Sequence, residues 1–100
     1  MQELPRVTAA TLDVLDALLA ADGPTWGLRV IAATGRPAGS VYPILARLEE
    51  RGWVTSLWED EERRGPRRRL YLLTDEAAAA ARTLLRDRRR PVARTAWTLS

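Results

Sequence analysis

Apolar residues at helical spacing mark the start of the chain. Within residues 8–24, leucines recur three and four positions apart, which places them on one face of a helix. Thr8 or Thr11 can cap the start of this helix, and Asp22-Gly23-Pro24 is a stop signal of the glycine-then-proline type. The pattern therefore predicts a first amphipathic helix.

A second, shorter helix is predicted over residues 25–35. Its apolar residues share one face, Thr25 can serve as the N-cap, and Gly35 can close the end. Gly27 weakens this helix by about 1 kcal/mol relative to alanine. The segment is predicted as a helix in spite of that cost.

Residues 36–54 predict a third helix, in which apolar residues recur at i, i+4 and i+7. Pro43 would cost roughly 3 kcal/mol in a helix interior. With Gly39 or Ser40 as the cap, however, Pro43 lies in the first turn, where a backbone N–H has no helical partner. That start also leaves the N–H groups of residues 40–42 exposed at the positive end of the helix.

The period changes after Gly52, where β-branched and aromatic residues become frequent. Residues 53–58 ("WVTSLW") and 68–74 ("RRLYLLT") are typical of strands, and a charged segment containing Gly65-Pro66 separates them. Two such runs around a glycine-containing turn predict a hairpin, with the polar segment as its solvated loop.

Five alanines make residues 75–90 a strong helix former, with Thr74, Asp75 and Glu76 at its start and Pro91 breaking it. The predicted order is then helix, helix, helix, strand, strand, helix. This is the order of a winged helix-turn-helix. The predicted fold class is mainly α with a β-hairpin.

The composition argues against an enzyme. The sequence has no cysteine and no histidine, which excludes disulfides, thiol nucleophiles, the usual general base and the commonest zinc ligand. The acids do not converge in a ligand-spaced pattern, so we expect no metal and no cofactor. No apolar stretch approaches the roughly 20 residues that cross a bilayer, and "MQELPRVT" lacks the shape of a signal peptide. We expect a cytoplasmic protein without a membrane partner.

Positive charge is concentrated in the second half of the chain. All 16 basic residues are arginine; residues 1–50 hold four against six acids (net −2), and residues 51–100 hold twelve against seven (net +5). Concentrated charge points to a polyanionic partner. A genome rich in arginine codons would explain the choice of arginine, but it leaves the placement unexplained.

A continuous series of motifs resembles the PadR family of bacterial transcriptional regulators. "GSVYPILARLEERGWVTSLWED" followed by "GPRRRLYLLT" matches a Tyr-Pro-leucine recognition helix, a Leu-Glu-x-x-Gly end, a tryptophan-bearing strand, and a Gly-Pro wing closing in Tyr-x-Leu-Thr. The resemblance covers about residues 8–82. The chain departs from it at Ala77, where the family commonly has glycine, and in lacking the C-terminal helical domain of larger members. Only the last helix is then expected to serve dimerisation, as in short members.

The resemblance implies a homodimeric, sequence-specific DNA-binding regulator on a palindromic operator, with repression as the expected sign. It implies a winged helix-turn-helix DNA-binding domain at residues 1–74, and a dimerisation helix and tail at residues 75–100. Dimerisation would use the first and last helices. The leucines expected in that interface are Leu12, Leu15, Leu19, Leu84 and Leu85.

Two groups of residues are predicted to contact DNA. Small residues let a recognition helix approach a duplex, serine and tyrosine can donate to phosphates and base edges, and arginines at a hairpin tip suit phosphates and the minor groove. The recognition-helix set is Arg36, Ala38, Gly39, Ser40, Tyr42, Pro43 and Arg47. The wing set is Arg63, Arg64, Gly65, Pro66, Arg67 and Arg68. If a dimer neutralises about six phosphates, log K should fall with log salt at a slope of about −5.

Each assignment has an alternative. Tyr42 can be a partly buried core aromatic, Arg47 can form a surface ion pair with Glu50, and the wing can be a self-paired solvated loop. The whole domain can be a protein-interaction module that has lost DNA binding. A small aromatic ligand held by Trp97 and Trp26 is a further partner that the resemblance implies, although packing of Trp97 on its own domain is favoured over it.

Overall fold

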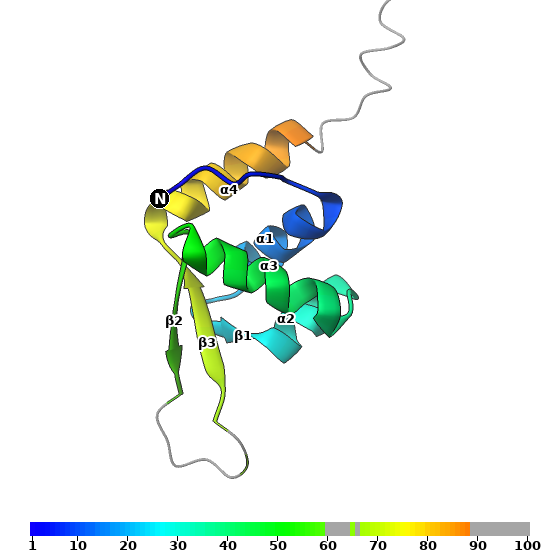
Figure 1. The fold of residues 1–100 in the computed structure, drawn as a ribbon, viewed down its shortest axis with the longest axis vertical. Coiled ribbons are helices and arrows are strands. Elements are labelled where there is room, and N and C mark those ends of the chain that lie inside the picture. Colours follow the sequence, from blue (N-terminus) through cyan, green and yellow to red (C-terminus); the bar gives the residue numbers. More distant parts are fainter. Residues whose placement is uncertain (60–64, 66, 89–100) are drawn as a thin grey trace, which may run out of the picture.

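Four helices and three short strands make up the described part of the chain (Figure 1). The structure is a computed structural model and describes residues 1–59, 65 and 67–88. Its elements are α1 (Ala9–Ala20), β1 (Thr25–Trp26), α2 (Gly27–Thr34), α3 (Ala38–Glu50), β2 (Val54–Trp58), β3 (Arg69–Leu73) and α4 (Asp75–Arg88). The predicted fold class is confirmed: the fold is mainly α with a β-hairpin, in winged helix-turn-helix order, with β1 as an additional strand.

The first helix begins at one of the two predicted caps. The Thr8 hydroxyl oxygen accepts a hydrogen bond from the Thr11 N–H at 3.1 Å, so Thr8 is the N-cap of α1. The helix ends at Ala20, Ala21 is extended, and Gly23 follows with a φ of 101°. The chain therefore leaves the helix just before the predicted stop signal.

Thr25 and Trp26 form a strand, so the prediction of Thr25 as a helix cap is wrong. The two residues pair antiparallel with Tyr71 and Leu70 of β3. Thr25 is only 4% exposed in that position, and α2 begins at Gly27 without a side-chain cap. A strand of two residues is too short to show the alternation of a strand in the sequence. Its pairing partner, moreover, comes from a distant part of the chain.

The third helix starts two or three residues earlier than predicted. Its N-cap is Pro37, whose carbonyl accepts hydrogen bonds from the Ser40 N–H at 2.9 Å and the Val41 N–H at 3.0 Å. The prediction of Gly39 or Ser40 as the cap is therefore wrong. The first-turn N–H groups without a helical partner are those of Ala38 and Gly39 instead of the three predicted ones.

Pro43 consequently lies in the second turn of α3. Because it has no N–H, it withholds the helical hydrogen bond from the carbonyl of Gly39. Gly39 is exposed, so water can replace that bond. The proline is tolerated there because the exposed face of α3 is in contact with water.

Glycines end α2 and α3 as predicted. Gly35 is the C-cap of α2, has a φ of 72°, and donates its N–H back into the helix at 2.8 Å. After α3, Gly52 (φ 79°) donates to the Glu49 carbonyl at 3.1 Å, and Trp53 donates to the Leu48 carbonyl at 2.8 Å. These two bonds form a Schellman motif, which directs the chain into β2.

The predicted hairpin is confirmed, and it forms part of a three-stranded antiparallel sheet of order β1-β3-β2. The pairing of β2 with β3 runs as far as Trp58 opposite Arg69. Beyond it, the Glu59 N–H donates to the Arg68 carbonyl at 2.6 Å. In Figure 1 the hairpin projects away from the helices. We call the hairpin beyond this pairing, together with Arg67 and Arg68, the wing.

The core lies among α1, α2, α3 and the sheet, and α4 closes it. Its largest fully buried side chains are Leu15, Leu45, Leu48, Val14, Val30 and Val41. The Thr74 hydroxyl accepts a hydrogen bond from the Ala77 N–H at 3.0 Å, which confirms the predicted cap of α4. Ala77 and Ala81 are both 0% exposed where α4 packs on α1. Their small side chains let the two helices approach closely.

The N-terminal segment runs along α4 (Figure 1). The Trp53 indole N–H donates to the Gln2 carbonyl at 2.7 Å, and an Arg88 guanidinium N–H donates to the Val7 carbonyl at 3.5 Å. Within the described ranges, no helix combines the length and hydropathy that spanning a membrane requires.

Two Gly→Ala substitutions around α3 should have opposite effects on stability. Gly52→Ala places a Cβ at positive φ, so the free energy of unfolding should fall by about 1–2 kcal/mol. Gly39→Ala meets no atom within 4 Å on a helical backbone, so it should gain about 0.5–1 kcal/mol. Urea unfolding of both variants measures this, and a loss of the same size in both would contradict the cap geometry.

Candidate nucleic-acid interface

Most of the predicted recognition-helix residues lie exposed at or near the start of α3. Those exposed there are Ala38, Gly39, Tyr42 and Pro43, whereas Arg47 is exposed in the last turn of the helix. Ser40 is half-buried. The small side chains around the first turn leave its backbone accessible to a partner, and the positive end of the helix favours an anionic group there.

Arg36 differs from the others because it is engaged within the fold. Its Nε donates to Asp13 Oδ2 of α1 at 2.8 Å, with side-chain exposures of 34% and 32%. Its backbone N–H also donates to the Thr34 hydroxyl at 3.1 Å. These contacts tie the turn between α2 and α3 to α1. We therefore assign Arg36 to holding the recognition helix in place.

Tyr42 packs against the first residue of α2. A Cβ at Gly27 would overlap the Tyr42 ring, so only glycine lets the ring approach this closely. Tyr42 nevertheless stays 42% exposed. One side of the ring packs against Gly27, and the other side faces solvent. Tyr42 is therefore not a core residue, and contact with DNA stays a prediction for it.

The two described arginines of the predicted wing set, Arg67 and Arg68, lie beside tryptophan rings. The Arg68 guanidinium carbon is 4.0 Å from the centroid of the Trp26 ring, and that of Arg67 is 5.9 Å from the Trp58 ring. Arg67 also donates from Nε to the Glu59 carbonyl at 3.1 Å. The other predicted wing residues are Gly65, which is exposed with a φ of 85°, and Arg63, Arg64 and Pro66, which lie outside the described residues.

A polar cluster joins the hairpin to the end of α3. Glu49 accepts a hydrogen bond from the Ser56 hydroxyl at 2.5 Å and pairs with Arg69 at 3.3 Å. The Arg69 guanidinium carbon is also 5.5 Å from the centroid of the Trp58 ring. Glu49 therefore fixes both strands of the hairpin relative to the recognition helix.

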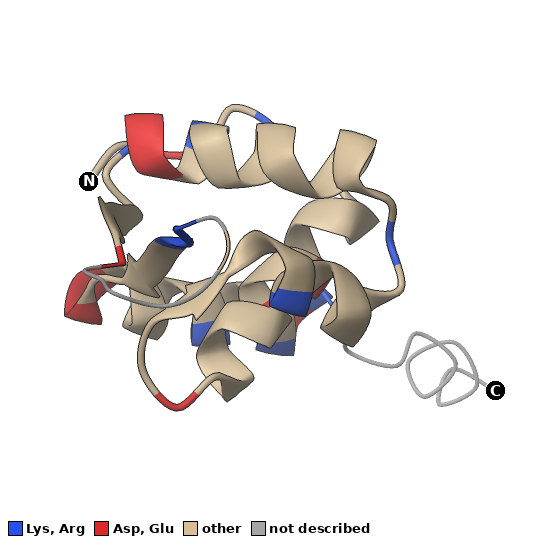
Figure 2. Cartoon of the chain, turned by 90° about the horizontal axis from the view of Figure 1, so that it is seen from below, with Lys and Arg blue, Asp and Glu red and all other residues tan. Residues whose placement is uncertain are grey.

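One cavity of about 490 Å³ brings Tyr42 of the predicted recognition-helix set together with Arg67 and Arg68 of the predicted wing set. Its walls include four aromatic residues and three consecutive arginines: Trp26, Tyr42, Trp58, Tyr71, Arg67, Arg68 and Arg69. Tyr42 comes from α3, and the arginines come from the hairpin. Figure 2 looks onto this end of the molecule, where both basic and acidic segments lie around the hairpin. Recognition helix and wing therefore share one cationic, aromatic surface.

Tyr71 forms the buried floor of this surface, at 7% exposure. Burial raises the pKa of its hydroxyl above the ordinary value of 10.0. Arg69 opposes this shift, while Glu49 and Tyr42 add to it. The hydroxyl is therefore neutral at physiological pH, and the net charge of the site comes from its arginines and Glu49.

The predicted interface leucines divide into two groups. Leu12 and Leu15 are buried inside the protomer, at 8% and 0% exposure, so their side chains pack within their own core. Leu19, Leu84 and Leu85 are half-buried. Trp97, the predicted ligand residue of the tail, lies outside the described residues.

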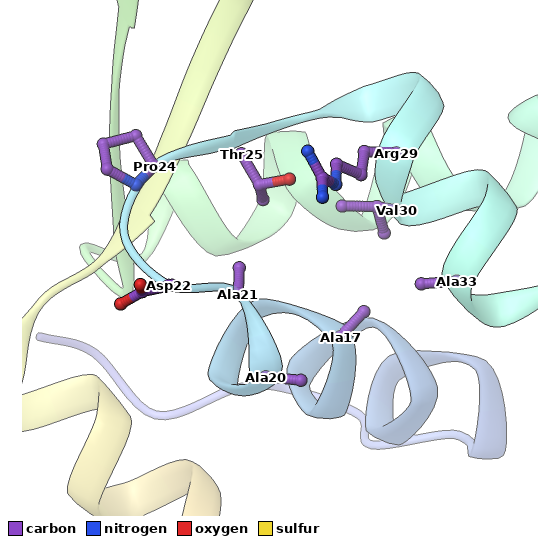
Figure 3. Close-up of a pocket in the computed structure, with 9 residues that line it drawn as sticks. All are labelled: Ala17, Ala20, Ala21, Asp22, Pro24, Thr25, Arg29, Val30 and Ala33. Atoms are coloured by element: carbon purple, nitrogen blue, oxygen red, sulfur yellow. The ribbon is translucent and has the colours of Figure 1, made fainter.

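A second hollow of about 360 Å³ lies between α1 and α2. In Figure 3, Ala17 and Ala21 face Val30 and Ala33 across it. Among the described residues, no group of three or more acids is placed to hold a metal ion, here or elsewhere. Asp22, Thr25 and Arg29 also line this hollow, and none of the predicted contact residues does.

Comparison with known proteins places the chain in a family. The model of the transcriptional regulator PadR-like family matches residues 15–83, more than half of the sequence. The chain belongs to the PadR-like family of transcriptional regulators. Membership of this family confirms that the PadR-like chain is a transcriptional regulator and not an enzyme. Among curated proteins, none matches it significantly in sequence.

Several solved structures are similar to this PadR-like chain. BpsR of Bordetella bronchiseptica is 27% identical, with a TM-score of 0.65, over 78% of this chain and 56% of BpsR. A PadR-like transcription factor of Bacteroides fragilis is 22% identical, with a TM-score of 0.65, over 89% of both chains. Bacillus subtilis PadR, solved in complex with operator DNA, is 17% identical, with a TM-score of 0.66, over 80% of this chain and 48% of PadR. The match thus spans about half the length of BpsR and of B. subtilis PadR.

Sequence reasoning did not single out Gly27, Trp58 or Arg69 as site residues. Trp58 and Arg69 end the two predicted strands, so pairing the strands across the turn would have placed them opposite each other. The close approach of Gly27 to Tyr42 has no local signal, because it depends on how α2 and α3 pack.

Tyr71 should make stability fall at alkaline pH. Its pKa is raised on folding, so its stabilising contribution is complete below the unfolded value of about 10 and is lost as the pH rises through the folded value. The sequence has no lysine, histidine or cysteine, so side chains of those types add nothing to the decline. Unfolding free energies measured from pH 8 to about pH 11 should decline for the wild type, and Tyr71→Phe should flatten the decline.

Tyr42→Phe is the matched control, because Tyr42 is 42% exposed and its loss should leave most of the decline in place. A Tyr71→Phe protein with the same pH dependence as the wild type would contradict the buried neutral hydroxyl.

Proposed function

We propose that this regulator binds a palindromic DNA operator as a homodimer and represses transcription there. The start of α3 would enter the major groove, and the wing would lie on the adjacent backbone or in the minor groove. The observation that carries the proposal is the shared cavity, in which Tyr42 of the recognition helix lies with Arg67, Arg68 and Arg69 of the hairpin. Both elements can therefore meet one duplex at the same time.

The recognition helix supports this function through its accessible first turn. Ala38 and Gly39 carry little side chain and leave their N–H groups available to a phosphate. Ser40 and Tyr42 add hydroxyl donors, which can contact phosphates or base edges. Exposed Arg47 follows along the helix and suits a phosphate or a guanine.

Two of the similar structures support a role on DNA. B. subtilis PadR is in complex with operator DNA, and the DNA binding of BpsR is regulated by 6-hydroxynicotinic acid. The similarity covers 80% and 78% of this chain, which includes most of its described fold. Because of that shared fold and of the arginines in the cavity, we infer that this chain also binds DNA.

Dimerisation is proposed through α4 together with the outer side of α1. Leu85 is half-buried there outside the core, and Leu19 and Leu84 are half-buried against the core's edge. An apolar cleft of about 430 Å³ also lies between the N-terminal segment and α4, lined in part by Leu4 and Leu84. A second copy of the chain would cover this surface and set the spacing of two operator half-sites.

A second, less supported proposal is that a small aromatic ligand, in contact with Trp97 and Trp26, regulates DNA binding. BpsR offers a relative whose DNA binding such a compound regulates. The Arg68 guanidinium, however, lies 4.0 Å from the centroid of the Trp26 ring. A ligand that stacks on that face must first displace Arg68.

Removing two wing arginines should weaken binding to every DNA sequence. For Arg67→Ala/Arg68→Ala, we expect the slope of log K against log salt to become about two to four less steep per dimer, because up to four phosphate contacts are lost. Fluorescence anisotropy with operator and unrelated duplexes, from about 50 to 200 mM salt, measures this slope.

The matched control is Arg82→Ala/Arg86→Ala, which removes the same charge from exposed positions of α4, away from the projecting hairpin (Figure 1). Its slope should change by less than about one. Equal slopes for the two double variants would contradict the wing contacts. A folded wild-type dimer without affinity for any duplex at about 50 mM salt would favour a protein-interaction module instead.

A charge in the α4 surface should dissociate the dimer. Leu85→Glu places a carboxylate at a half-buried position outside the protomer core, so the chain should fold but remain monomeric. Light scattering after size-exclusion chromatography measures the mass. Leu57→Glu, on an exposed position of β2, should leave the dimer intact. A dimeric Leu85→Glu protein would place the interface elsewhere.

A further inference from the structure

The hairpin arginines near the cavity all lie close to an aromatic ring. Arg68 is 4.0 Å from the centroid of the Trp26 ring, while Arg67 and Arg69 are 5.9 and 5.5 Å from that of Trp58. Each guanidinium carbon is within about 6 Å, the range in which a cation is attracted to the face of a ring. The rings thus hold the cations on the surface that faces the proposed duplex.

The two rings are themselves fixed by the sheet. Trp26 belongs to β1 and is paired with Leu70 of β3, and Trp58 lies opposite Arg69 at the end of β2. A tryptophan has two side-chain torsions, whereas an unsupported arginine samples many rotamers. Stacking therefore transfers the rigidity of the sheet to the guanidinium groups.

The arrangement also explains why tryptophan stands at an exposed position. Trp58 is 51% exposed, and an exposed ring contributes little to a core. It is placed instead where Arg67 and Arg69 lie beside it. This placement suits orientation of the charged groups more than burial.

We propose that Trp26 and Trp58 are positioning residues, which aim Arg68 and Arg67 at one sugar–phosphate strand seated in the cavity, while Arg69 stays paired with Glu49. This inference rests on the proposed function. A helix in the major groove and a wing in the neighbouring minor groove are separated by a single backbone strand of the duplex. The cavity lies between these same two elements, with Tyr42 on one wall and the arginines on the other.

The chemistry of the cavity fits such a strand. Guanidinium groups pair with phosphate oxygens, and aromatic faces pack against the apolar side of deoxyribose. A sugar–phosphate strand presents both kinds of group in alternation. Contacts of this kind read no bases, so the tryptophans should affect all duplexes alike.

Substitution of Trp26 separates the effect of arginine orientation from the effect of arginine charge. Trp26→Leu keeps every arginine, so the slope of log K against log salt should stay within about 0.5 of the wild-type value. Affinity at a fixed salt concentration should nevertheless fall by about 5- to 30-fold for a dimer, equally on operator and unrelated duplexes. Trp26→Phe, which retains an aromatic face, should recover part of this loss.

Leu57→Ala is the matched control. It also removes an exposed apolar side chain from the hairpin, but Leu57 takes part in none of the arginine–ring contacts described above. Its affinity should equal that of the wild type. Should Trp26→Leu fail to fold, Trp58→Leu at the end of β2 makes the same comparison through Arg67.

A measurement without DNA tests the aiming directly. The 15N relaxation of the Arg68 Nε–H should report a more mobile side chain in Trp26→Leu than in the wild type, with Trp26→Phe in between. Unchanged mobility, or wild-type affinity of Trp26→Leu for a duplex that the wild type binds, would overturn the inference while leaving the DNA-binding proposal intact. A wild-type protein that binds no duplex would instead overturn the DNA-binding proposal itself, together with the placement of a sugar–phosphate strand in the cavity.

Discussion

Antiparallel pairing of β3 with a strand on each side is the constraint on which the rest of the interface depends. Pairing with β2 forms the hairpin that carries the wing, and pairing with β1 brings the start of α2 to the base of that hairpin. Trp26 therefore arrives beside Arg68, and Gly27 arrives beneath the ring of Tyr42. Together with the contacts of Glu49 to Ser56 and Arg69, the two-residue strand β1 sets the distance between the helix-turn-helix and the wing.

Several arginines of the described residues hold the fold together, while others lie on the surface, although all carry the same charge. Arg36 pairs with Asp13, Arg69 pairs with Glu49, and Arg51 donates to a carbonyl of the N-terminal segment. Arg67 and Arg68 lie beside the rings of Trp58 and Trp26, and Arg67 donates a hydrogen bond to the backbone carbonyl of Glu59. A guanidinium paired with a carboxylate is a poor partner for phosphate, whereas one stacked on a ring keeps its hydrogen-bond donors available. The neighbour of an arginine thus indicates its role: an arginine paired with an acid holds the fold, and one beside a ring is available to an anion.

Local signals predicted most element boundaries, and the exceptions have physical causes. Thr8, Gly35, Gly52 and Thr74 act where the pattern indicates, because a cap or stop involves residues within about one turn of it. Pro43 was placed one turn too early, because the cost of an internal proline depends on whether water reaches the freed carbonyl. Solvent access to that carbonyl is a property of the folded surface and not of the local sequence.

The sequence by itself determined the order of helices and strands, the hairpin, and the excess of arginine around its turn. Periodicity and turn chemistry act over a few residues, so the chain alone displays them. Only the tertiary structure decided that Thr25 is a strand residue, that Arg36 belongs to Asp13, and that Leu15 lies wholly inside the protomer. It also decided which tryptophan supports which arginine. Burial, sheet pairing and ring stacking join residues that are far apart in the chain, and their proximity exists only once the core has formed.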